Sequence, residues 1–243
     1  MNTLETLQQS CPVVPDDHLL IAETFLAQFK SQFEPRGVIH VGAHHGQEVG
    51  LYRRFGFKKI LLIEANPELA QDLRTQFANQ PDVQVIHGAA TETDGPVDLL
   101  VHTSRSGSIE PASLLELKEF KRIVSTLHTP ETVTVPGFRI DSFFRRGPAV
   151  VADYNFMVLD IQGAELMALR GARHTVQAMD AVQAEAGIIE MYEGGALYPD
   201  LQSYLAGLGL PLNKGVLHEL YDENGRFPAW GEFYFANPTS SNP

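Results

Sequence analysis

The sequence predicts an α/β fold, with helices on both faces of a mostly parallel β-sheet. Short apolar runs of strand length alternate with amphipathic segments of helix length through the first half of the chain. A strand, a helix and another strand in succession form a βαβ unit, whose two strands lie parallel in one sheet. We expect strands at residues 38–41, 59–63, 83–86, 97–101, 133–140, 156–159 and 181–188, and a closing antiparallel pair at 216–221 and 232–236.

The expected helices begin and end at recognisable residues. Asp16 or Asp17 can cap a helix whose apolar side chains recur at three- and four-residue spacing and which ends before Pro35. Pro67 stands at the favoured first position of a second helix. Other helices are expected at 46–55, 164–169 and 201–208, and from Pro111 to about Arg122.

We expect a single domain at residues 37–243, preceded by an extension at residues 1–36 that carries the first helix. A polar segment at about residues 104–130 interrupts the alternation of strands and helices. Insertions of this kind in α/β folds commonly lie over the binding site. We therefore expect this segment to cover the site as a lid.

A turn with two glycines, Gly42-Ala43-His44-His45-Gly46, leaves the first strand and leads into a helix. Dinucleotide sites use G-x-G-x-x-G, whose middle glycine lets the backbone approach a pyrophosphate. Here His44 occupies that position and would crowd a pyrophosphate. The turn therefore favours a nucleoside ligand without a phosphate, such as S-adenosylmethionine. The simpler alternative is that Gly42 and Gly46 serve only a tight connection.

An acidic residue, Glu64, ends the second strand about twenty residues after this turn. An acid at this strand end and this spacing accepts hydrogen bonds from ribose hydroxyls in nucleotide-binding folds. Together with the turn, Glu64 predicts a nucleoside site at the carboxyl edge of the sheet.

Four segments together resemble the FkbM-type S-adenosylmethionine-dependent methyltransferases. They are His-Val-Gly-Ala-His-His-Gly-Gln-Glu at 40–48, Ile-Glu-Ala-Asn-Pro at 63–67, Leu-Asp-Ile-Gln-Gly-Ala-Glu-Leu at 159–166 and Leu-Arg-Gly-Ala at 169–172, with support from 106–111 and 138–143. The resemblance runs from about residue 37 to 237. It implies a class I methyltransferase Rossmann-like sheet and O-methylation of sugars or secondary-metabolite hydroxyls. His40 stands where many members carry Asp, which leaves open how the amino-acid end of the cofactor is held.

The turn and the resemblance together imply where S-adenosylmethionine, the expected cofactor, would bind. Glu64 would hold its ribose, and Asp160 would lie near its sulfur. The turn residues would lie under the cofactor, and the residues after the second and third strands would flank its adenine: Gly42, Ala43, His44 and Gly46, then Ala65, Asn66, Ala89 and Ala90.

Two carboxylates, Asp160 and Glu165, are the candidate catalytic residues. Asp160 directly follows the apolar strand at 156–159, so it lies at the carboxyl edge where open α/β folds bind ligands. A hydroxyl that attacks a methyl group must lose its proton, and Asp160 is placed to act as the base or to orient the acceptor. We expect Glu165 to position Asp160 or the substrate, although the helix dipole alone favours a carboxylate there. A mechanism with Asp160 as a metal ligand is the alternative.

The acceptor is expected to be a small molecule or a carbohydrate. Ser106, Ser108, Glu190 and Tyr192 are the candidate substrate-binding residues, and a solvated loop is the alternative for the last two. The (Asn/Asp)-Pro-Pro-(Tyr/Phe) element that nucleobase amino methyltransferases carry at this edge is missing from the sequence. This argues against methyl transfer to the exocyclic amines of bases.

Composition and charge disfavour several classes of partner. The 18 Lys and Arg residues against 30 Asp and Glu leave a net charge of −12, which disfavours nucleic acid. The single cysteine, Cys11, cannot form an internal disulfide. No apolar run approaches about 18 residues and the first residues lack a secretory signal, so we expect no membrane insertion and a cytoplasmic location. The oligomeric state stays open.

Other classes of function are weighed against this interpretation. His40, His44 and His45 are not expected to hold a metal, because adjacent histidines usually point apart. An NAD-dependent oxidoreductase would require the middle glycine that the turn lacks. A non-catalytic protein of the same fold that binds a nucleoside or a carbohydrate remains the alternative to a methyltransferase.

Overall fold

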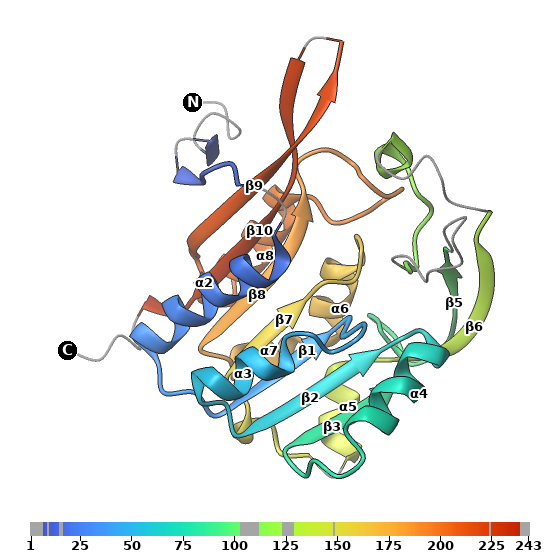
Figure 1. Cartoon of the computed structure of the whole chain (residues 1–243), viewed down its shortest axis with the longest axis vertical. Helices are drawn as coiled ribbons and strands as arrows, with labels where there is room; N and C mark the ends of the chain where they lie inside the picture. The colour runs from blue at the N-terminus through green and yellow to red at the C-terminus, as the bar shows by residue number, and fades with distance from the viewer. Residues whose placement is uncertain are drawn as a thin grey trace.

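The fold is built on one seven-stranded sheet of order β3-β2-β1-β7-β8-β10-β9 (Figure 1). The structure, a computed structural model, describes residues 7–8, 10–14, 17–102, 112–122, 129–147, 149–223 and 225–238. The first five strands in this order are parallel, and β10 runs antiparallel to both of its neighbours, β8 and β9. This confirms the predicted α/β fold and its closing antiparallel pair. The strands are β1 (Gly37–Val41), β2 (Lys59–Glu64), β3 (Val83–His87), β7 (Phe156–Leu159), β8 (Ala181–Gly187), β9 (Leu212–Asp222) and β10 (Gly225–Ala236).

The order of the strands reverses between β1 and β7. The chain begins in the middle of the sheet at β1, adds β2 and β3 on one side, and later adds β7 and β8 on the other. Open α/β sheets bind ligands in the crevice at such a reversal, outside the carboxyl ends of the strands. Because Val41 pairs with Leu159, the residues that follow them, Gly42 and Asp160, meet at this point.

Helices cover both faces of the sheet. One core cluster joins one face of the sheet to α2, α3 and α4, and a second joins the other face to α5, α6, α7 and α8. No helix in the described ranges is long and apolar enough to cross a membrane. The helices are α2 (His18–Gln32), α3 (Val49–Phe55), α4 (Pro67–Gln76), α5 (Ile140–Arg146), α6 (Glu165–Gly171), α7 (Arg173–Gln177) and α8 (Tyr198–Ala206).

The N-terminal helix α2 packs into the core of the sheet. Its predicted cap is confirmed, since the Asp17 side chain accepts a hydrogen bond from the Leu20 N–H at 3.1 Å. Phe29 is fully buried, with its ring centroid 4.9 Å from that of Phe156 in β7. Phe25 stacks on Tyr234 of β10 at 5.9 Å. The helix is therefore fixed above the middle of the sheet, close to the strand reversal (Figure 1).

A second, three-stranded sheet contains β4 (Ala89–Ala90), β6 (Glu131–Phe138) and β5 (Gly95–Val101). The predicted strands at 97–101 and 133–140 therefore exist but do not join the main sheet. They pair with each other in antiparallel register instead. The second strand also ends earlier than predicted, because Ile140 is fully buried and begins helix α5.

The predicted helix from Pro111 to about Arg122 is wrong over its described part. Only the 3-10 turn η1 (Glu119–Arg122) is helical there. Ser113 forms a β-bridge with Leu100, and Leu117 forms one with Tyr192. Backbone pairing with two distant segments thus replaces the local hydrogen bonds that a helix would require.

The contact at the strand reversal gives a stability prediction. Gly42 has a φ of +87°, and a Cβ there would lie 1.8 Å from the Asp160 carbonyl oxygen. We expect Gly42→Ala to lower the free energy of unfolding by about 2–4 kcal/mol, from backbone strain and overpacking. Gly50→Ala is the matched control: a Cβ there meets nothing within 4 Å, and alanine in helix α3 should raise stability by up to about 1 kcal/mol. Urea unfolding measures both, and equal effects would contradict the contact.

Candidate functional site

A pocket of about 340 Å³ opens at the strand reversal. Its lining comes mainly from the ends of β1, β2, β3 and β7 and the residues that follow them. Helices α2 and α4, strand β5 and residues 112–114 complete it. The lining near β2 and β3 is apolar and includes Ala65, Leu69, Ala89, Ala90 and Leu99. The lining near β1 and β7 is polar and includes His18, His44, Gln47, Glu48, Asp160 and Gln162.

Glu64 lies between these two parts, at the end of β2. Its Oε2 accepts a hydrogen bond from the His44 N–H at 2.8 Å, and its Oε1 accepts one from the Asn66 N–H at 2.8 Å. Burial raises the pKa of Glu64, while these backbone donors oppose the rise. The carboxylate is thus held in one place, with its side chain lining the pocket.

The turn after β1 brings three of its four predicted residues to the pocket. Gly42, Ala43 and His44 line it. Gly46 lies on the other side of the turn, where a Cβ would meet Leu73 at 3.0 Å. His44 has a φ of +47° although it is not a glycine, and its N–H donates to Glu64.

The residues predicted to flank an adenine divide in the same way. Ala65, Ala89 and Ala90 line the apolar part of the pocket. Asn66 is buried, and its side chain caps helix α4 by accepting a hydrogen bond from the Glu68 N–H at 2.9 Å. Asn66 therefore fixes the segment after β2, and only indirectly the pocket.

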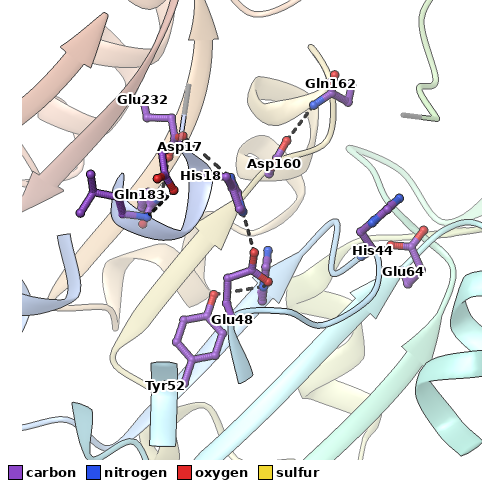
Figure 2. Close-up of polar contacts among 12 residues, drawn as sticks. Asp17, His18, His44, Glu48, Tyr52, Glu64, Asp160, Gln162, Gln183 and Glu232 are labelled. Carbon is purple, nitrogen blue, oxygen red and sulfur yellow. Dashed lines mark hydrogen bonds and ion pairs between the residues drawn. The ribbon is translucent and has the colours of Figure 1, made fainter. Parts of the chain in front are cut away.

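Asp160 reaches the pocket from the end of β7, and its side chain is oriented by Gln162, which Tyr192 and Ser113 hold in turn. Its Oδ1 accepts a hydrogen bond from Gln162 Nε2 at 2.8 Å (Figure 2). The Tyr192 hydroxyl donates to Gln162 Oε1. Ser113 Oγ donates to the Gln162 carbonyl at 2.7 Å. Gln162 was not predicted as a site residue, although it stands inside the quoted motif, because only the fold brings its partners to it.

Glu165 holds the backbone of the loop that follows Asp160. Its Oε1 accepts hydrogen bonds from the Ile161 N–H at 3.0 Å and the Gly163 N–H at 3.2 Å. Gln162, between them, has a φ of +57°. Glu165 is buried and does not line the pocket, so its contact with Asp160 runs through the backbone of the loop.

The predicted acceptor-binding residues are not brought together in the pocket. Ser106 and Ser108 lie outside the described residues. Glu190 forms an ion pair with Lys118 and accepts a hydrogen bond from the Gly194 N–H at 2.7 Å. Tyr192 is buried and touches the site through Gln162. Acceptor binding by these residues stays a prediction.

A polar network that the sequence did not indicate joins helix α2 to the turn. His18 Nε2 donates to Glu48 Oε1 at 2.6 Å, and this hydrogen bond raises the pKa of His18 to about 9. Burial opposes ionisation of Glu48, but the bond from His18 and the charges of the two histidines hold its pKa at about 2. Behind Glu48, His40 Nδ1 lies 3.0 Å from the Tyr52 hydroxyl. In the part of the chain that the structure describes, no three His, Cys, Asp or Glu side chains are grouped to hold a metal.

The burial of Glu165 gives a prediction for stability against pH. Burial is the main cause that raises its pKa from 4.5 to about 7, and the charge of Asp160 adds to it. The folded protein therefore binds this proton more tightly than the unfolded chain, so its stabilising contribution is complete below pH 4.5 and is lost as the pH rises through about 7. Stability should fall between pH 4.5 and 6.5 by at most about 1.4 kcal/mol per pH unit, and Glu165→Gln should remove this contribution. Urea unfolding from pH 4.5 to 6.5 measures it below the range in which His18 begins to contribute a fall of its own, with Glu131→Gln at an exposed site as control; parallel curves for wild type and Glu165→Gln would contradict the shift.

Solved structures of several proteins are similar to this chain at low sequence identity. A FkbM methyltransferase from Methylobacillus flagellatus KT is 15% identical with a TM-score of 0.50, and the match covers 95% of this chain and 57% of that chain. An uncharacterised protein from Listeria monocytogenes serotype 4b is 8% identical with a TM-score of 0.50, covering 95% of this chain and 71% of that one. TrmK from M. capricolum, solved with S-adenosyl-homocysteine, is 7% identical with a TM-score of 0.48, covering 91% and 70%.

The sequence comparisons give the family. The chain spans little more than half of the Methylobacillus protein, and a search of curated proteins returned no match. The family model of the methyltransferase FkbM domain matches residues 40–212, a range that contains the turn after β1, Glu64, Asp160 and Glu165. This match covers well over half of the sequence, and the chain therefore belongs to the FkbM methyltransferase family.

Proposed function

We propose that the protein is an S-adenosylmethionine-dependent O-methyltransferase that acts on a hydroxyl of a sugar or of another small hydroxylated metabolite. One observation carries the proposal: Asp160 lines the same pocket as Glu64 and the turn after β1. Glu64, at the end of β2, and Asp160, after β7, are thus brought to one cavity from the two parallel strands that flank β1. Membership of the FkbM family supports methyl transfer as the reaction.

The lining of the pocket fits the proposed cofactor better than a dinucleotide. The apolar part beside Ala65 and Ala89 suits an adenine, and Glu64 beside it suits a ribose. A pyrophosphate would require backbone donors or cations. The His44 N–H is already bonded to Glu64, and the pocket lining contains no Lys or Arg among the described residues. The cationic His18 lies at the polar end of the pocket, apart from the His44–Glu64 pair, and is already paired with Glu48 (Figure 2). These features support a nucleoside without phosphates.

Asp160 is proposed as the base. When bound, the cofactor supplies a methyl group on a positively charged sulfur, which needs no further activation. The protein must therefore bring the acceptor hydroxyl into line and take its proton as the new carbon–oxygen bond forms. Asp160 can accept this proton through the oxygen that Gln162 does not occupy. The loop that carries Asp160 is fixed by Glu165, which makes Glu165 a positioning residue in this proposal.

Charge favours a small hydroxylated acceptor over nucleic acid. The net charge is −12, and the pocket itself is lined by the carboxylates Glu48, Glu64 and Asp160. A polyanion would be repelled from such a surface unless basic groups neutralised its phosphates. A sugar, which is neutral and rich in hydroxyls, can instead donate hydrogen bonds to carboxylates.

The cofactor assignment is tested by binding. We expect S-adenosylmethionine and S-adenosylhomocysteine to bind, and NAD not to bind, in calorimetry. Glu64→Ala should weaken S-adenosylhomocysteine binding by about 1–3 kcal/mol, because it removes hydrogen bonds to a charged group. Glu68→Ala changes an exposed carboxylate four residues later and should have no effect. Unchanged affinity in Glu64→Ala would refute the ribose assignment, and tight binding of NAD would refute the cofactor.

The catalytic assignment is tested by turnover. A screen of sugars, glycosides and small hydroxylated metabolites for S-adenosylhomocysteine release would identify an acceptor. With that acceptor, Asp160→Asn should lower kcat by about 10²–10⁴-fold, the usual cost of losing a general base, with cofactor affinity nearly unchanged. Asp72→Asn, at an exposed position of helix α4, serves as control. Normal turnover by Asp160→Asn would exclude this role, and activity that is lost with a chelator and restored by magnesium would favour the metal-assisted alternative.

A further inference from the structure

The polar end of the pocket is completed by a residue from outside the range of the family match. His18 is the first residue of helix α2 and lines the pocket, whereas the match begins at residue 40. Its side chain is 39% exposed, so a ligand can reach it. Glu48 Oε1 accepts a hydrogen bond from the Nε2 of the ring at 2.6 Å, and Nδ1 forms a longer ion pair with Glu232 Oε1 at 4.0 Å, which is too long for a hydrogen bond (Figure 2).

The charges around the pocket are unbalanced without His18. Three carboxylates line it, on Glu48, Glu64 and Asp160, and within the described ranges its lining has no lysine or arginine. The carboxylate at the amino-acid end of a ligand would be repelled by these groups unless a cation lay beside it, because charges a few ångströms apart interact strongly in a half-buried site. His18, with a pKa of about 9, is a cation at neutral pH.

The strand order tells which end of the cofactor meets His18. The apolar residues that suit the adenine follow β2 and β3, and Glu64, which suits the ribose, ends β2. The rest of the ligand must then extend across the end of β1 toward β7, where Glu48, Asp160 and His18 lie. Figure 2 shows His18 between Glu48 and Glu232, well apart from the His44–Glu64 pair. The amino-acid end of the cofactor therefore lies toward His18.

We infer that His18 binds the carboxylate of the amino-acid end of the cofactor, with Glu48 as the positioning residue that fixes its ring. The inference rests on the proposed function. Glu48 is 3% exposed and its carboxylate occupies Nε2, whereas Nδ1 has only the ion pair with Glu232 at 4.0 Å and can donate a hydrogen bond to the ligand. Helix α2 cannot move away easily, since Phe25 and Phe29 are buried in the core of the sheet. The N-terminal helix is thus part of the binding site.

A pair of ligands separates this contact from binding of the nucleoside. S-adenosylhomocysteine carries the amino-acid carboxylate, and 5′-methylthioadenosine has the same nucleoside and thioether but no amino acid. In calorimetry we expect His18→Gln to weaken S-adenosylhomocysteine about 10–100-fold, the size of a charge-assisted hydrogen bond, and to leave 5′-methylthioadenosine unchanged. His18→Lys, which restores a cation, should recover part of the loss. Glu48→Gln should cause a smaller loss, again for S-adenosylhomocysteine alone.

A modified ligand identifies the carboxylate as the partner. The carboxamide of S-adenosylhomocysteine should bind the wild type more weakly than the acid, and His18→Gln should bind both alike, because the two changes remove one interaction. Equal binding of the acid by wild type and His18→Gln would overturn the inference, and so would an equal loss of both nucleosides in that variant. If the wild type bound neither nucleoside, the proposed function would fail and this inference with it.

Discussion

The close approach of two backbone segments at the strand reversal is the constraint on which the site depends. Gly42 leaves β1 directly against the carbonyl of Asp160, where any side chain would collide. The Asp160 N–H in turn donates to the Val41 carbonyl at 3.0 Å. This contact places the loop that begins at Asp160, the candidate catalytic residue, beside the turn that begins at Gly42. The pocket exists because the connections that leave the neighbouring parallel strands β1 and β7 turn to opposite faces of the sheet.

Carboxylates dominate the site, and each is stabilised by a different partner. Glu64 accepts two backbone N–H groups, which also hold the turn around it. Glu165 accepts two from the loop after β7, yet its burial still favours the protonated form. Glu48 is instead paired with a cationic histidine. Buried charges require such partners because desolvation is costly. Each pairing therefore also holds the segment of backbone or the helix that supplies the partner.

The N-terminal helix α2 both packs on the sheet and lines the pocket. Its apolar side packs on β7 and β10, and its first residue reaches the polar end of the pocket. A helix that lies outside the matched family domain thereby contributes to the same cavity. The described part of the segment after β5 also contributes to this cavity, because residues 112–114 line it and Ser113 Oγ donates a hydrogen bond to the Gln162 carbonyl.

The sequence by itself determined the parallel sheet, the capped helix at Asp17, and the positions of Glu64 and Asp160 at strand ends. These follow from local periodicity and from the fact that parallel strands place their carboxyl ends at one edge. It could not determine that Ser113 and Leu117 form β-bridges in place of a helix, because their partners, Leu100 and Tyr192, are remote in the sequence. Nor could it place Gln162 behind Asp160, or His18 against Glu48. His18 and Glu48 are 30 residues apart, and the packing of helix α2 on the sheet brings them together. Gln162 is oriented toward Asp160 by the strained loop, in which it has a φ of +57°, and by its hydrogen bond from Tyr192.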